Sequence, residues 1–217
     1  MKQLGLVAIV CLLTACGHTR GPEEITDDGL VRVPSRAAGG VYRAAATDFT
    51  PYKKLILEPP TIEFTEKWRD NHPEVSDTEV TRIRNEAVKL FREEFTKELV
   101  KGGVYEFADT PGPDVLLVTP RVLDLDILAP DAGNDIGQRS FTPGPVKMQV
   151  TGDLRDAASN TLVARVIIFE GQNRYGFNEL RLANRATNAH EMRIGFSKWS
   201  RMVHEALNVA KVARPRE

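Results

Sequence analysis

The sequence predicts an α+β domain: a mostly antiparallel sheet of four to five strands, with two long helices packed on one face of it. Two observations lead to this prediction. One helical pattern lies in the middle of the chain and a second lies near its end, and several short apolar or alternating runs lie between them. Strands that cluster between two helices favour α+β over a regular alternation of strand and helix.

The first helix has the clearest signals in the chain. Ser76-Asp77-Thr78-Glu79 is a capping box, in which the Ser76 hydroxyl accepts a hydrogen bond from the backbone N–H of Glu79. Apolar residues follow at steps of three and four, as on one face of a helix: Val80, Ile83, Ala87, Leu90, Phe91, Phe95 and Leu99. The second helix is expected from about Asn188 to Val212, because apolar residues recur with the same period there.

The strands are predicted from shorter patterns. Residues 55–57 form an apolar run that ends at Pro59 and Pro60, which cannot donate ladder hydrogen bonds. Residues 115–127 are continuously apolar at first and then alternate, which predicts a strand with a bend at Pro120. Residues 146–154 and 161–171 flank a short polar turn and predict a hairpin.

The first residues have the plan of an export signal. Lys2 precedes an apolar run of about ten residues, too short to span a membrane. Leu13-Thr14-Ala15-Cys16 resembles the lipobox of bacterial lipoproteins, which implies cleavage between Ala15 and Cys16 and lipid attachment to the Cys16 thiol. Two or more acyl chains hold a protein stably at a bilayer. The alternative is an ordinary secretory signal that happens to be followed by a cysteine.

The predicted organisation has three parts: a leader of residues 1–15, a lipidated flexible tether of residues 16–48, and one periplasmic domain of residues 49–217. The tether is rich in glycine, proline and charge, without a sustained apolar period. It also contains apolar residues that would allow it to dock on the domain instead: Leu30, Val31, Val33, Val41 and Tyr42. By resemblance to Gram-negative lipoproteins, the absence of aspartate at Gly17 implies the outer membrane.

Composition argues against two classes of partner. The formal net charge is −1, with 29 basic and 30 acidic residues, so the chain as a whole has no electrostatic signature of nucleic-acid or anionic-membrane binding. Removing Cys11 with the leader leaves one cysteine, which excludes an internal disulfide. The lipid anchor is therefore the expected membrane contact.

Three stretches resemble a bacterial lipoprotein family that is catalogued only as a domain of unknown function. They are "PYKKLILEPPTIEF", "GPDVLLVTPRVLDLDI" and "VTGDLRDAASNTLVARV", and the resemblance extends over about residues 49–212. These motifs are structural and contain no catalytic residue. The resemblance implies a periplasmic lipoprotein domain and leaves its activity open.

The sequence contains no recognised catalytic or metal-binding motif. The four histidines lack metal-binding spacing, so neither a metal nor a cofactor is expected. Asp124 and Asp126 are expected on one face of a strand with Asp153 nearby, which would suit a hydrolase, although a solvated strand edge explains them better. Arginines and an aromatic residue between residues 171 and 188 have the composition of an interface: Arg174, Tyr175, Arg181 and Arg185. A surface loop that covers the sheet edge is the simpler explanation of the same stretch.

The sequence therefore predicts a lipoprotein of the outer membrane that is not an enzyme and that binds another envelope component, most simply a protein. One alternative is a carrier that holds a lipid or small molecule in an apolar cavity between helices and sheet, beside Phe91, Phe95 and Trp199. The other alternative is the aspartate-dependent hydrolase.

Overall fold

The computed structural model describes residues 25–35, 39–45, 47–100, 105–128, 141–142, 144–171 and 181–212. Its strands and helices follow the chain in this order: β1 Val31–Val33, β2 Gly40–Arg43, β3 Lys54–Leu57, β4 Thr61–Phe64, α1 Trp68–Asn71, α2 Asp77–Leu99, β5 Glu106–Phe107, β6 Val115–Ile127, β7 Phe141–Thr142, β8 Val146–Asp156, β9 Leu162–Glu170, β10 Arg181–Leu182 and α3 Arg185–Val212. The described residues contain no helix that is long and apolar enough to cross a bilayer.

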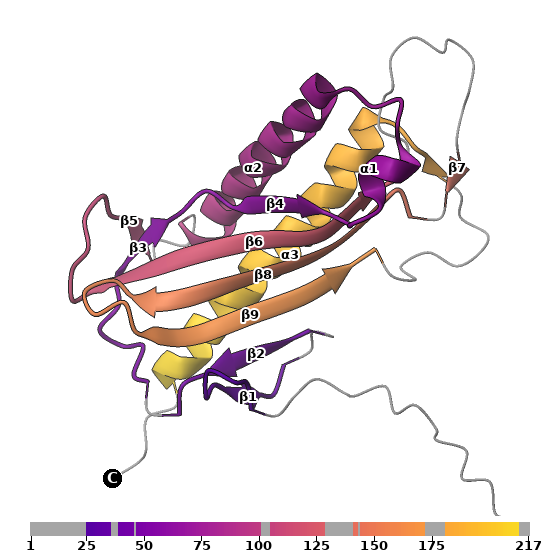
Figure 1. Ribbon diagram of the computed structural model, residues 1–217. Helices are drawn as coiled ribbons and strands as arrows, with labels where there is room; N and C mark the ends of the chain where they lie inside the picture. Colours follow the sequence, from indigo (N-terminus) through magenta and orange to yellow (C-terminus); the bar gives the residue numbers. More distant parts are fainter. Residues whose placement is uncertain are drawn as a thin grey trace, which may run out of the picture.

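The described residues form an α+β structure whose sheet is larger than predicted. Eight strands form one sheet in the order β1-β2-β9-β8-β6-β3-β5, and β4 pairs with β6 as well (Figure 1). The sheet is mixed, because β3 is parallel to both β5 and β6 and β4 is parallel to β6. The prediction of four to five mostly antiparallel strands was therefore wrong.

The length of β6 explains part of this difference. Its first half pairs with β3 up to Val118, and its second half pairs with β4 from Arg121 onward. Pro120 lies between these two registers, and Pro59 and Pro60 lie in the link between β3 and β4. The prolines therefore separate two short parallel strands along one long neighbour, whereas the sequence pattern indicated only the end of a strand.

Strands β1 and β2 explain the rest. Residues 31–43 lie within the predicted tether, but β2 pairs antiparallel with β9 and β1 pairs antiparallel with β2. Leu30 and Tyr42 are buried, at 1% and 4% exposure. Residues 31–43 are therefore part of the sheet and not of a flexible tether. The pairing of β2 with β9 satisfies backbone groups that an open edge of β9 would expose.

A network of ion pairs connects the N-terminal segment around Asp28 to the strands β8 and β9. Arg165 of β9 donates to Asp153 of β8 at 2.6 Å and to Asp28 at 2.7 Å. The hydrogen bond to Asp153 is the largest effect that raises the pKa of Arg165. The guanidinium therefore ties the first described residues to the middle of the sheet.

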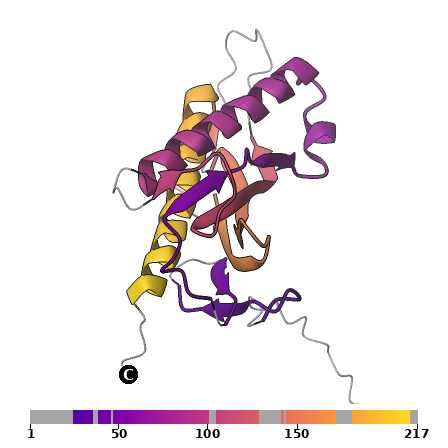
Figure 2. The same cartoon turned by 90° about the vertical axis from the view of Figure 1, so that its left-hand side faces the viewer.

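Helices α2 and α3 lie together over one face of the sheet (Figures 1 and 2). The Ser76 hydroxyl accepts from the Glu79 N–H at 3.2 Å, so the predicted cap of α2 is confirmed. Helix α3 begins three residues before the predicted Asn188, because the Asn184 carboxamide oxygen accepts from the Thr187 N–H at 2.9 Å.

Candidate functional site

Most of the site residues predicted from the sequence cannot be placed. Leu13, Thr14, Ala15 and Cys16 lie outside the described residues, as do Arg174 and Tyr175. Arg181 lies in β10, opposite Thr142 of β7. Arg185 is the first residue of α3, and its guanidinium lies 3.4 Å from the Glu79 carboxylate of α2.

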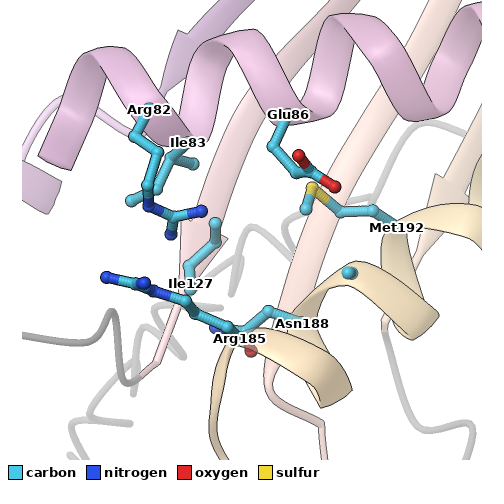
Figure 3. A pocket seen from close by; sticks show the side chains of 8 residues that line it. Arg82, Ile83, Glu86, Ile127, Arg185, Asn188 and Met192 are labelled. Atoms are coloured by element: carbon cyan, nitrogen blue, oxygen red, sulfur yellow. The ribbon is translucent and has the colours of Figure 1, made fainter.

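A small pocket lies beside Arg185, between the N-terminal halves of α2 and α3. Figure 3 shows Arg82 and Glu86 entering it from α2 and Arg185 entering it from α3. Its volume of about 20 Å³ is enough for little more than one water molecule. The hydrogen bonds that Arg82 donates to Glu79, at 2.7 and 2.8 Å, are the main cause of the lowered pKa of that carboxyl. This pocket is a region of ion pairs between two helices and has no room for an organic ligand.

Asp124 and Asp153 do not form an acid–base pair. Asp124 is exposed and has a φ of 51° at an irregularity in the pairing of β6 with β8. Asp153 lies opposite Thr119, which precedes Asp124 by five residues in β6, so the backbone positions of Asp124 and Asp153 are about 17 Å apart along the strand direction. Both oxygens of Asp153 accept from Arg165. The described residues also contain no group of three or more metal-binding side chains. This separation does not suit a hydrolase that would use Asp124 and Asp153 together.

The interface between helices and sheet is filled by aromatic side chains. Phe91, Phe95 and Trp199 are each 0% exposed. The ring of Phe91 lies 5.3 Å from that of Trp199, and the ring of Phe95 lies 6.1 Å from it. The Trp199 indole N–H donates to the Val166 carbonyl at 3.1 Å. The place where a carrier would need its cavity is occupied by these three rings.

The best candidate site is a groove between the N-terminal strands and α3, at the lower end of the molecule in Figure 1. Its volume is about 600 Å³, within the usual range of ligand sites. We call it the β2–α3 groove and define it by its lining: Val33, Pro34, Ser35, Val41, Arg43, Lys198, Arg201, Met202, Glu205 and Ala206. Val41 and Arg43 face α3 because alternate residues of β2 point to the same side of the sheet.

Only some of the basic side chains in the β2–α3 groove form ion pairs with described carboxylates. Lys198 forms an ion pair with the Glu170 carboxylate at 3.3 Å. Within the described part of the chain, neither Arg43 nor Arg201 has a carboxylate partner. Among the described residues of the lining, Glu205 is the single acidic one. The groove therefore combines an apolar floor with an excess of positive charge.

Sequence reasoning missed this site because no motif marks it. Lys198, Arg201 and Glu205 look like the solvated face of an amphipathic helix, and Arg43 lies in the predicted tether. Only the docking of β2 on β9 brings Arg43 opposite α3. The one available signal was the alternative that residues 30–42 dock on the domain.

No family model and no curated protein matches the chain. Among solved structures, the chain is similar to a dodecamer of a PelC variant from Paraburkholderia phytofirmans, with 13% identity and a TM-score of 0.37 over 78% of this chain and 98% of that one. It is also similar to a neuraminyllactose-binding hemagglutinin homolog from Helicobacter pylori, with 10% identity and a TM-score of 0.38 over 78% and 87% of the two chains.

Proposed function

We propose that this protein is a lipoprotein anchored through Cys16 at the periplasmic face of the outer membrane, and that its domain is a non-catalytic module that binds another component of the envelope. We also propose that it belongs with the lipoprotein family whose strand motifs it resembles. The anchor rests on the register of the apolar run, the small residues Thr14 and Ala15, and the cysteine that follows them.

One observation carries the binding role. The β2–α3 groove has the size of a ligand site and contains two arginines that no described carboxylate neutralises. Such a surface favours an anionic ligand, because charge-assisted hydrogen bonds to guanidinium groups are strong and directional.

We prefer this role to an internal carrier for a packing reason. A carrier of the kind considered above needs space beside Phe91, Phe95 and Trp199, and these side chains fill the interface between helices and sheet. A ligand is better accommodated at the groove, where α3 and β2 leave about 600 Å³ between them.

Metabolic labelling with palmitate tests the anchor. The full chain is expressed in a Gram-negative host, and Cys16→Ala is compared with Cys11→Ala, a matched change inside the leader. Cys16→Ala should abolish the label and leave a precursor, whereas Cys11→Ala should keep both label and cleavage. Label that persists in Cys16→Ala would refute the assignment.

Fractionation of the two membranes tests the location. The wild-type chain should sediment with the outer membrane, and Gly17→Asp should move it to the inner membrane if the same sorting rule applies. An inner-membrane position for the wild-type chain would contradict the proposed location and leave the anchor intact.

Photo-crosslinking in cells tests the binding role. A photoreactive amino acid placed at Ala206, in the groove, should capture an envelope component, and the same residue at Asn85, on the exposed face of α2, should capture much less. Equal capture at both positions would contradict a role for the groove.

A further inference from the structure

The β2–α3 groove has two chemistries side by side. Val33, Val41, Met202 and Ala206 give it an apolar floor, while Arg43 and Arg201 supply positive charge. Val41 and Met202 are buried, at 4% and 9% exposure, whereas Arg201 is exposed. A ligand that fits this lining has an extended apolar part and an anionic end.

Arg43 is the most specific element of the groove. Its guanidinium lies over the Phe49 ring, 4.9 Å from the centroid, and donates a long hydrogen bond of 3.5 Å to the Thr47 carbonyl. Its Nε is buried and has no hydrogen-bond partner among the residues that the structure describes. Burial lowers the pKa of Arg43, yet an arginine keeps its charge at neutral pH. A partly desolvated cation of this kind is stabilised by an anion that enters the groove.

The groove also lies at the end of the domain that an anchor at Cys16 would hold near the bilayer. Ile25, the first described residue, follows Cys16 by nine positions, so the chain between them spans at most about 30 Å. Ile25 and Val31 are exposed apolar residues of the segment that leads into the groove, at 62% and 39% exposure. Exposed apolar side chains beside cations are typical of surfaces that bind an anionic bilayer.

We propose that the β2–α3 groove binds an anionic phospholipid of the membrane to which the protein is anchored. The phosphate lies against Arg43 and Arg201, and one acyl chain lies along Val33, Val41 and Met202. This proposal rests on the proposed function, because it takes the anchor to set the distance to the bilayer. An acidic peptide fits less well, since its amide groups need polar partners and Ser35 is the only uncharged polar side chain among the described lining residues.

The experiment uses the full lipidated chain in phosphatidylcholine vesicles that contain a small fraction of photoactivatable lipid. The probe is phosphatidylglycerol with a diazirine on one acyl chain, compared with phosphatidylcholine that has the same chain. Adducts should form on the peptides of residues 31–43 and 198–206 with the phosphatidylglycerol probe, and about tenfold less with the phosphatidylcholine probe.

Matched variants test whether the preference for phosphatidylglycerol depends on the charge of Arg43 and Arg201. Arg43→Gln combined with Arg201→Gln should reduce the phosphatidylglycerol adducts about tenfold, while Arg121→Gln, at an exposed position of β6, should leave them unchanged. Arg43→Lys with wild-type Arg201 keeps the charge and should keep the preference for phosphatidylglycerol, which separates loss of charge from loss of the stacking on Phe49. Circular dichroism verifies that each variant is folded.

Three outcomes would overturn the proposal: equal adducts from the two probes, adducts spread over α2, or no lipid adduct while an acidic peptide is captured at Ala206. The same digests report the lipid on the Cys16 peptide. A lipidated Cys16 without groove adducts would remove the phospholipid proposal and leave the anchor standing, whereas a bare Cys16 thiol would remove the anchor itself.

Discussion

Gly152→Ala is the most informative test of the packing between helices and sheet. A Cβ atom at Gly152 of β8 would lie 2.5 Å from Cζ2 and 3.0 Å from Cη2 of the Trp199 indole. The indole cannot move away easily, because its N–H is hydrogen-bonded to Val166 and its ring packs against Phe91. Overpacking of this kind costs about 1–3 kcal/mol of unfolding free energy, a fall of about 2–10 °C in Tm.

Denaturant unfolding followed by circular dichroism measures this cost. Gly112→Ala is the matched control, because its Cβ would meet its nearest atoms at an ordinary 3.4 Å, and it should change stability by less than about 1 kcal/mol.

Trp199→Phe removes the two clashing atoms. Combining it with Gly152→Ala should therefore cost about 1 kcal/mol less than the sum of the two single changes. If Gly152→Ala is as stable as the control, the indole does not press on β8, and the argument against an internal cavity fails.

Three further predictions concern the scaffold. Arg165→Gln removes the main partner of Asp153, whose side chain is only 14% exposed. It should lower the unfolding free energy by about 1–3 kcal/mol, measured by thermal unfolding, and speed hydrogen exchange in β1. Unchanged exchange in β1 would contradict the role of Arg165 in holding the N-terminal segment. Ser76→Ala removes the N-cap of α2 and should cost about 1 kcal/mol, measured by urea unfolding, with Ser76→Asn as the variant that retains the cap. Burial is the first cause that raises the pKa of Tyr52, from 10.0 to about 12. The contribution of this pKa shift to the unfolding free energy is complete below pH 10 and is lost as the pH rises towards 12. Tyr52→Phe should not show this loss when the unfolding free energy is measured against pH.

Local patterns predicted the helices well and the sheet poorly. The cap at Ser76 and the apolar period after it depend on neighbours in the sequence, so the first helix could be read directly. The pairing of β3 and β4 with β6 depends on contacts about 60 residues apart, which no local pattern encodes. A strand of four residues such as β2 becomes recognisable only when β9 is beside it.

The candidate site was less predictable than the fold, because it too is formed by residues that are far apart in the sequence. Arg43 and Arg201 are 158 positions apart, and each looks like an ordinary solvated cation in its own segment. Arg185 was predicted to lie in an interface because of its aromatic and arginine neighbours in the sequence. In the structure it forms an ion pair with Glu79, beside a pocket with a volume of about 20 Å³. Composition along the chain does not report which cations lack a carboxylate partner.

Hydrogen exchange of the full lipidated chain tests the central claim most directly, namely that the β2–α3 groove is the working surface of a module held at a membrane. The protein is compared in detergent micelles and in vesicles that contain phosphatidylglycerol. Amides of residues 31–43 and 198–206 should become protected in the vesicles, while those at the start of α2 should not change. Protection at the start of α2 alone, or no difference between the two environments, would contradict the account.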